Sequence, residues 1–492
     1  MSKRKNHGYK KSGKKPNATN KPSGGKRPAP GGSPPKAKGT GGKKPVIAEV
    51  TCSGLTSEGK GIIQWEGKNL EVEHLLPGET AEVAVSTKGR HTTTELKRVT
   101  QPSSDRVEPP CVYFYECGGC QLQHMTNQAQ AGFKQKTVDA LMKPFGKPQA
   151  MLTMEHPYAY RNKSHTTFGM NRDRQIIGGL YARNSHEIIP MDRCLIHDPK
   201  ADEIAGTIKG IMKSTKLRPY NEDTGDGFLR HVLIKVGKTS GEIMVVLVAA
   251  SSVFPGKNNF VKALRKAHPE ITTLVHNVNN KDTSMVLGDE EKVLFGPGTI
   301  TDTLGGMEFV ISAKSFYQVN PVQTEKLYDK AMEMADLTGK ETVIDAYCGV
   351  GTIGLIAAKT AGRVTGVELN SDAVRDAIRN AKRNGVKNAR FYQGDAGKFM
   401  VDMAERGENA DVVMMDPPRK GSDEAFLSSV VKLQPERIVY VSCNPETQVR
   451  DLEYLEKNGY NVEEIQPVDM FPQTVHVEAV TKLVRKKKAG IQ

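Results

Sequence analysis

Long hydrophobic runs are missing from this sequence of 492 residues, and so is any acidic residue near its N-terminus. The longest strongly apolar run, IMVVLVAA at 243–250, is far too short to span a bilayer. The basic N-terminus also lacks the apolar segment that a signal peptide requires. Seven cysteines, an odd number in a long chain, do not indicate a disulfide framework. We therefore expect a cytoplasmic protein without membrane contact, and its cysteines need another explanation.

The first 45 residues contain fourteen Lys and Arg, no Asp or Glu and almost no apolar side chains. Such a segment cannot bury enough surface to offset its chain entropy, which predicts a disordered basic arm at 1–45. The remaining chain has 56 basic and 56 acidic residues, so the whole net charge of +14 lies in the arm. A basic arm typically follows polyanion backbones, which favours contact with nucleic acid over a tail that only aids solubility.

Three folded regions are expected behind the arm. Residues 46–103 contain five short strand-like stretches separated by turns, which predicts a small β-barrel of the OB type. Residues 104–314 alternate strands with helical stretches and predict an α+β central domain, whose topology the pattern does not give. In residues 315–492, β and α stretches alternate regularly from about 340. This predicts a Rossmann-like α/β domain with a doubly wound, mostly parallel sheet.

The predicted strands of this last region end in four acidic residues and a thiol. These are Asp345, Glu368, Asp395, Asp416 and Cys443, each separated from the next by 21 to 27 residues, or one βα unit. In doubly wound sheets, ligands bind outside the carboxyl ends of the strands. Acidic residues at four successive ends therefore predict a ligand site rather than packing.

A glycine-rich loop, DAYCGVGTIG at 345–354, follows the first of these strands. Gly349 and Gly351 allow a ligand to approach the backbone closely, and Glu368 is placed to bind ribose hydroxyls. Because acidic Asp345 precedes the loop, a pyrophosphate would be repelled. The cationic S-adenosylmethionine therefore fits better than a dinucleotide, and the alternative is a loop that only connects a strand to a helix.

Asp416 begins the stretch DPPRKG, whose two prolines hold its carboxylate at the strand end. A similar Asp-Pro-Pro accepts a hydrogen bond from the substrate in amino-group methyltransferases, but that chemistry needs no thiol. Methylation of uracil at C5 does, because thiolate attack at C6 makes C5 nucleophilic, after which a base removes the C5 proton. Cys443, on a turn stiffened by Asn-Pro, is the candidate nucleophile, with an inert buried cysteine as the alternative. Glu478 is the preferred base and His476 the fallback.

Six stretches together resemble the RNA uracil-5-methyltransferase family: SFYQVN (315–320), DAYCGVGTIG, GVELN (366–370), DPPRKG, VSCNP and FPQTVHVE. The resemblance implies Cys443 as the nucleophile, Glu478 as the base and Phe316 as a platform that stacks on the target uracil. It implies S-adenosylmethionine bound by Gln318, Tyr347, Glu368 and Asp416, to which we add Asp345, Gly349, Gly351 and Asp395 as cofactor-binding candidates. Residues 46–103 resemble the TRAM domain, an RNA-binding barrel found in family members.

Four further cysteines have the spacing of an all-sulfur metal site: Cys111, Cys117, Cys120 and the distant Cys194. Spacing alone does not choose between zinc and an iron–sulfur cluster. The family resemblance implies a [4Fe-4S] cluster with a structural or RNA-binding role. Such a cluster belongs to the ribosomal-RNA branch, and members that act on tRNA often lack it. Cys52 and Cys348 are expected to be inert.

The leading hypothesis is therefore a monomeric enzyme that methylates C5 of a uridine in 23S ribosomal RNA. The first alternative is the corresponding enzyme for the tRNA T-loop. An RNA cytosine C5-methyltransferase is a weaker alternative, because those enzymes usually have Pro-Cys where this chain has DPPR. A non-catalytic RNA-binding protein is the alternative outside enzymes, against which the thiol, the carboxylates and the glycine loop argue.

Overall fold

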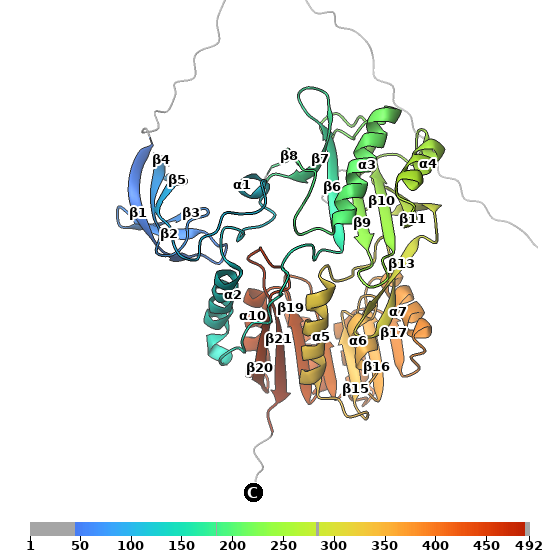
Figure 1. Cartoon of the computed structure of the whole chain (residues 1–492). Helices are drawn as coiled ribbons and strands as arrows, with labels where there is room; N and C mark the ends of the chain where they lie inside the picture. Colours follow the sequence, from blue (N-terminus) through green and yellow to red (C-terminus); the bar gives the residue numbers. More distant parts are fainter. Residues whose placement is uncertain (1–44, 184, 282–284, 488–492) are drawn as a thin grey trace, which may run out of the picture.

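The computed structural model describes residues 45–183, 185–281 and 285–487 (Figure 1). The predicted basic arm, residues 1–45, lies outside the described residues except for Pro45. The described chain forms a five-stranded sheet, two seven-stranded sheets and a two-stranded sheet. No helix in these described ranges is both long and apolar enough to cross a membrane.

The N-terminal sheet is antiparallel, with strand order β3-β2-β1-β4-β5. Its strands are β1 (Val46–Leu55), β2 (Gly61–Trp65), β3 (Lys68–Val72), β4 (Thr80–Lys88) and β5 (His91–Gln101). Alternate side chains point inward and form a small core that includes Ile63, Val72, Val83 and the thiol of Cys52. The five strands expected from the alternating pattern are confirmed, while the TRAM and barrel assignment stays a prediction.

The central sheet has the order β12-β11-β10-β9-β6-β7-β8, and only β10 and β11 pair in parallel. Its strands are β6 (Lys163–Met170), β7 (Ile176–Tyr181), β8 (Ile188–Pro190), β9 (Leu229–Val236), β10 (Ile243–Ala249), β11 (Ile271–Val278) and β12 (Glu290–Phe295). The apolar run at 243–250 is β10, an interior strand whose residues are all buried. Helices α3 (Pro199–Thr215) and α4 (Lys257–Ala267) pack their apolar side chains on this sheet.

Short elements precede and follow the central sheet. Before it come α1 (Phe114–Cys117), α2 (Asn127–Met142) and the 3-10 helix η1 (Lys143–Phe145). After it, the hairpin of β13 (Thr299–Leu304) and β14 (Met307–Ser312) leads to the C-terminal region. Although α2 comes early in the chain, it packs beside the C-terminal sheet, near α10 and β20 (Figure 1).

The C-terminal sheet has the order β17-β16-β15-β18-β19-β21-β20. Five strands are parallel: β15 (Thr342–Ala346), β16 (Arg363–Glu368), β17 (Ala389–Gln393), β18 (Val412–Met415) and β19 (Arg437–Ser442). β20 (Tyr460–Val468) and β21 (Glu478–Arg485) complete it, and β21 is antiparallel to both neighbours. The helices are α5 (Pro321–Ala335), α6 (Thr352–Ala357), α7 (Ser371–Arg383), α8 (Ala396–Glu405), α9 (Glu424–Leu433) and α10 (Pro445–Lys457). The predicted Rossmann-like α/β region is confirmed.

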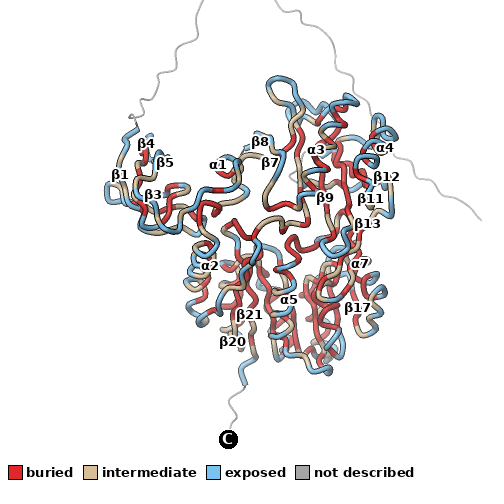
Figure 2. The backbone as a smooth tube through the Cα atoms, in the orientation of Figure 1, coloured by how far each residue is buried: buried red, intermediate tan, exposed pale blue. Residues whose placement is uncertain are grey.

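Helices cover both faces of this sheet, so its middle strands are buried from end to end (Figure 2). The carboxyl ends of the parallel strands meet at one edge. Because β21 is antiparallel, its first residues lie at that same edge. Ser442 of β19 pairs with Ala479 of β21, so Cys443, which follows Ser442, and Glu478, which precedes Ala479, both adjoin this pair at the same edge.

Candidate active site

Cys443 lies between the end of β19 and the start of α10. Asn444 caps the helix, since its side-chain oxygen accepts a hydrogen bond from the Glu446 backbone N–H at 3.2 Å. Pro445 occupies the first turn, where a missing N–H is harmless. The thiol is thus half-buried at the N-terminal end of a 13-residue helix, where the helix dipole favours a thiolate.

The charges around Cys443 act against ionisation of the thiol. Burial, followed by the negative charges of Glu478 and Asp416, raises the pKa of Cys443 to about 11, and nearby Arg419 partly opposes them. The unliganded enzyme therefore holds a protonated thiol at neutral pH. The sequence-based expectation of a polar, accessible thiol is met only in part, because the side chain is half-buried beside two carboxyl groups.

Glu478 and Asp416 are two carboxyl groups with unusual protonation. Glu478 is 3% exposed, and burial together with the charge of Asp416 raises its pKa to about 8. Burial raises the pKa of Asp416 to about 7. Among the described residues, neither carboxyl group has a hydrogen-bond partner from the protein. Both are therefore able to gain or lose a proton near neutral pH.

His476, the fallback base, is placed differently. It is exposed, and its Nδ1 lies 3.1 Å from the guanidinium of Arg419. Burial of the ring atoms and the positive charge of Arg419 lower the pKa of His476. Glu478 adjoins the Ser442–Ala479 pair next to Cys443, whereas His476 lies two residues before β21 begins.

The loop that follows Asp416 is fixed by α10. The Asp451 carboxylate accepts hydrogen bonds from the Ser422 backbone N–H at 2.8 Å and from the Tyr440 hydroxyl at 2.7 Å. Arg450 donates to the Ser422 carbonyl at 2.7 Å. Gly421 has a φ of +74°, and a Cβ there would lie 2.6 Å from the Arg450 guanidinium. Asp416 and the nucleophile are thus positioned by the same helix.

The glycine-rich loop is held by two of the predicted acidic residues. Asp345 is 1% exposed and accepts a hydrogen bond from the Gly354 backbone N–H at 2.7 Å. Burial raises the pKa of Asp345 to about 8, even though this hydrogen bond acts in the opposite direction. Glu368 accepts from the backbone N–H groups of Gly349 at 3.1 Å and Asn370 at 2.8 Å. Gly351 begins α6 at a φ of +83°, which favours glycine.

The other residues predicted to bind the cofactor or the uracil differ in exposure and in their contacts. Tyr347 has a φ of +62°, and its ring centroid lies 4.9 Å from that of Phe426. Asp395 is exposed and caps α8 by accepting from the Lys398 backbone N–H at 2.9 Å. Gln318 is 7% exposed, whereas Phe316, two residues earlier, is 64% exposed. Within the described residues, no ring contact of Phe316 is found, so the structure leaves its ring free at the surface.

Tyr328 contacts both the start of α6 and Gln318, and sequence analysis did not identify it. Its hydroxyl lies 3.3 Å from Thr352 Oγ1, at the start of α6, and also hydrogen-bonds to Gln318. Burial and the charges of Asp416 and Glu478 raise its pKa. Tyr328 belongs to the buried face of α5, where its sequence position looks like any other core residue. Arg419 was also missed, although it directly follows the two prolines of a motif that was examined.

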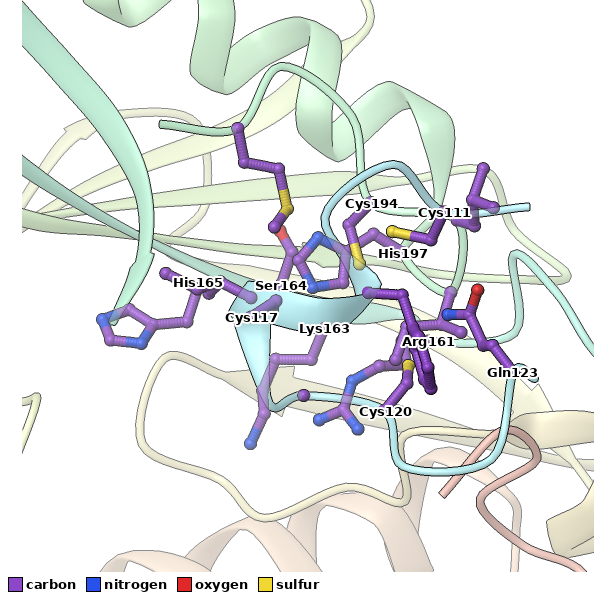
Figure 3. Close-up of a pocket in the computed structure, with 16 residues that line it drawn as sticks. Cys111, Cys117, Cys120, Gln123, Arg161, Lys163, Ser164, His165, Cys194 and His197 are labelled. Atoms are coloured by element: carbon purple, nitrogen blue, oxygen red, sulfur yellow. The ribbon is translucent and has the colours of Figure 1, made fainter. Parts of the chain in front are cut away.

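All seven cysteines lie in the described residues and are free thiols. Four of them, Cys111, Cys117, Cys120 and Cys194, line one cavity of about 260 Å³. Arg161, Lys163 and His197 line the same cavity (Figure 3). No three His, Cys, Asp or Glu side chains of the described ranges converge as ligands of one metal ion. The structure therefore gathers the four predicted thiols but does not by itself support a metal centre.

Cys194 is held by a neighbouring carboxylate. Its backbone N–H donates to Asp202 Oδ2 at 2.6 Å, and Asp202 Oδ1 lies 2.9 Å from His197 Nδ1. Burial alone would raise the pKa of Cys194, but the hydrogen bond and charge of His197 lower it below its usual value. This one thiol of the four is therefore predisposed to act as a thiolate ligand.

Comparison with known proteins identifies the family. A family model described as tRNA (Uracil-5-)-methyltransferase matches residues 291–486. The chain is 45% identical to an uncharacterized RNA methyltransferase of Halalkalibacterium halodurans, over 89% of this chain and 97% of that protein. The chain belongs to the RNA uracil-5-methyltransferase family. A second member, an uncharacterized RNA methyltransferase of Listeria innocua, is 42% identical over 90% of this chain and 99% of its own.

A solved structure extends the likeness to the whole fold of this uracil-5-methyltransferase. The tRNA (uracil-54, C5)-methyltransferase of Pyrococcus abyssi, in complex with S-adenosyl-L-homocysteine, superposes with a TM-score of 0.72 at 26% identity. The match covers 89% of this chain and 99% of that one. The resemblance expected from the six sequence stretches is therefore confirmed at the level of the family, and the enzyme is a methyltransferase.

Proposed function

We propose that the enzyme transfers a methyl group from S-adenosylmethionine to C5 of a uridine in 23S ribosomal RNA, through a covalent bond between Cys443 and C6. The observation that carries this proposal is that Cys443 and Glu478 lie at the same edge of the sheet, next to the paired residues Ser442 of β19 and Ala479 of β21. A half-buried thiol and a carboxyl group with a pKa of about 8 are the two groups that this reaction needs.

The cofactor would lie over the glycine-rich loop. S-adenosylmethionine supplies an electrophilic methyl group when bound. The hydrogen bonds that Asp345 and Glu368 make to the loop hold Gly349 and Gly351 in place for close backbone approach. We assign cofactor contacts to these residues and to the surrounding Gln318, Tyr347, Asp395 and Asp416. A bound sulfonium would also offset the negative charge that ionised Asp416 and Glu478 bring to the site.

The residues then act in sequence on the uracil. Cys443 loses its proton and its sulfur bonds to C6, which places electron density on C5. C5 takes the methyl group, and Glu478 removes the C5 proton. The returning electron pair expels the sulfur from C6 as a thiolate, which restores the ring double bond, and the thiolate regains from solvent the proton that Cys443 released to solvent when it attacked. The exposed ring of Phe316 is proposed to stack on the target base.

A substrate with 5-fluorouridine tests this chemistry, because fluorine cannot leave as a proton. Wild-type enzyme should form an adduct that survives a denaturing gel, and Cys443→Ala should form none. Cys52→Ala, which removes a thiol of the N-terminal core, is the matched control and should form the adduct. With ordinary RNA, Glu478→Gln should accumulate the adduct. A Cys443→Ala enzyme that still methylates would refute the mechanism.

The cysteine site is proposed to hold a [4Fe-4S] cluster. The support for this proposal is that all four thiols line one cavity of about 260 Å³ in the described structure. Anaerobically purified enzyme should be brown and contain roughly four iron atoms per chain. Colourless protein with one zinc ion would contradict the assignment.

The four cysteines favour ribosomal RNA as the target, because the family resemblance ties the cluster to that branch. The T-loop of tRNA is the second candidate, which the likeness to the Pyrococcus abyssi tRNA enzyme favours. Mapping 5-methyluridine in both RNAs from a strain that lacks the gene distinguishes them. Loss from tRNA alone would contradict the ribosomal proposal. We further propose that the enzyme acts as a monomer, which sedimentation can test.

A further inference from the structure

The loop that delivers Glu478 is held by parts of the chain more than 300 residues away. This loop, residues 469–477, connects β20 to β21. Lys134 of α2, which is completely buried, donates to Asp469 Oδ1 at 2.5 Å and to the Phe471 carbonyl at 3.0 Å. The Tyr160 hydroxyl donates to the Pro472 carbonyl at 3.0 Å. The first half of the loop is therefore anchored by α2 and Tyr160.

Gln473 is the residue through which the second half of the loop is held. It is completely buried and has a φ of +71°, a left-handed conformation that is rare for a residue with a side chain. Its carbonyl accepts hydrogen bonds from the backbone N–H groups of Gln121 and Leu122, both at 3.0 Å. Its backbone N–H and side-chain oxygen pair with the amide of Gln130 at 3.1 and 2.9 Å. Such a strained conformation persists only where its surroundings over-determine it.

The segment that donates hydrogen bonds to the Gln473 carbonyl also contains three of the four cysteines of the cavity. We call residues 111–122 the cysteine segment. Gln121 directly follows Cys120, and its side chain donates to the Gly118 carbonyl at 2.7 Å, within the turn between Cys117 and Cys120. The same side chain accepts from the Val475 backbone N–H at 3.4 Å. The Gln121 side chain therefore connects this turn to the residues that precede β21.

Packing reinforces these hydrogen bonds. Leu122 and Val475 belong to one apolar cluster with Leu76 of the N-terminal region. A Cβ at Gly59 would lie 3.0 Å from both the Leu122 and the Val475 side chains, so the turn between β1 and β2 rests directly on the two segments. The cysteine segment and the 469–477 loop thus form one packed unit beneath the N-terminal sheet.

We propose that Gln121 and Gln473 are positioning residues that together couple the cysteine segment to Glu478. An ordered cysteine site keeps Glu478 at the same edge as Cys443, and a disordered one slows proton removal from C5. The kinetic part of this inference rests on the proposed role of Glu478 as the base. The structural coupling does not, because it depends only on contacts between the two segments.

Hydrogen exchange of the full-length enzyme tests the structural coupling. In Cys120→Ser, exchange should accelerate both in the cysteine segment and in the 469–477 loop, while the N-terminal sheet at 46–101 stays as in the wild type. Gln121→Ala keeps every cysteine and should also accelerate exchange in the loop, which gives a result even if Cys120→Ser folds poorly. Faster exchange confined to the cysteine segment in either variant would overturn the proposal.

A kinetic test uses Gln121→Ala, because this change keeps every cysteine and removes the side-chain hydrogen bonds that join the Gly118 carbonyl to the Val475 backbone N–H. Release of the RNA adduct should slow roughly ten- to hundredfold, the scale of a small misplacement of a catalytic group. The rate of adduct formation on 5-fluorouridine RNA should stay near that of the wild type. Equal slowing of both steps would indicate a general structural defect and overturn the positioning role.

Double variants then locate the coupling. Gln323 of α5 holds the same loop by donating to the Asp469 carbonyl at 3.0 Å, but within the described residues it makes no hydrogen bond to the cysteine segment. The effects of Cys120→Ser and Gln121→Ala on adduct release should be non-additive, whereas those of Cys120→Ser and Gln323→Ala should add. Additivity in both pairs would refute the proposal. If Glu478→Gln releases product normally but the exchange coupling is present, the assigned base is wrong and the coupling stands.

Discussion

Replacing Glu478 by Gln should make the unliganded enzyme more stable at alkaline pH. Glu478 is 3% exposed, and burial with the charge of Asp416 raises its pKa from 4.5 to about 8. Because the folded value exceeds the unfolded one, the folded enzyme keeps a proton that the unfolded chain releases. Stability is therefore lost as the pH rises from about 4.5 to about 8, and the loss is complete above that.

The size of the loss follows from the shift in pKa. One pKa unit corresponds to about 1.36 kcal/mol, so the shift of Glu478 gives a loss of about 5 kcal/mol in the free energy of unfolding at high pH. Glutamine has the same shape and no charge to bury. Part of this energy belongs to repulsion by Asp416, which the variant also removes.

Melting temperatures of the wild type and Glu478→Gln should coincide near pH 4.5 and separate up to pH 8.5, with the variant higher by roughly 10 to 20 °C at that pH. The expected scale is roughly 2 to 4 °C per kcal/mol for a unit of about 150–250 residues. Glu341→Gln is a control of opposite sign, because hydrogen bonds with Thr338 lower the pKa of Glu341 to about 2. That variant should be the less stable one at neutral pH and approach the wild type as the pH falls. Parallel curves for Glu478→Gln and the wild type would show that Glu478 ionises normally.

Three further changes test other parts of the enzyme. Arg419→Gln removes the positive charge that lowers the pKa of Cys443. Adduct formation on 5-fluorouridine RNA should therefore slow about tenfold at pH 7 for each unit by which the pKa of Cys443 rises, and it should recover at higher pH. A rate that does not depend on pH would contradict this. Gly354→Ala places a Cβ 2.7 Å from Asp345 Oδ2. The change should lower the free energy of unfolding by about 1–3 kcal/mol and weaken S-adenosylmethionine binding, which calorimetry measures. An unchanged affinity would argue against a cofactor role for this loop. Deleting residues 1–45 should flatten the salt dependence of RNA affinity, by roughly 0.7 to 0.9 in slope per phosphate neutralised, and leave the methylated position unchanged; an unaltered slope would make the arm a solubilising tail.

The strand ends of the C-terminal sheet could be predicted because they depend on local repetition. Each βα unit returns the chain in the same direction, so Asp345, Glu368, Asp416 and Cys443 meet at one edge whatever the details of the helices. The position of Glu478 could not be derived in this way. It depends on the insertion of β21, antiparallel, between β19 and β20, and such non-local pairing leaves no period in the sequence.

The cysteines illustrate the same limit. Their spacing predicts an all-sulfur site, and the structure places all four around one cavity. The hydrogen bonds from the cysteine segment to the Gln473 carbonyl join residues more than 340 positions apart through backbone groups, which any sequence could supply. Tyr328 was missed for a related reason. A tyrosine on the buried face of a helix gives no signal until the neighbouring strand ends are placed around its hydroxyl.

Three carboxyl groups at the same edge of the sheet have raised pKa values. Burial raises the pKa values of Asp345, Asp416 and Glu478 to between about 7 and about 8. A fold selected for stability alone would pair or replace Asp416 and Glu478, because burying a carboxylate without a hydrogen-bond partner is unfavourable. Their retention has a use in the proposed reaction. A carboxyl group whose pKa lies near neutrality can give up its proton as a cationic ligand arrives and take another from C5 of the uracil, so the burial that weakens the empty enzyme is what fits Glu478 to act as a base.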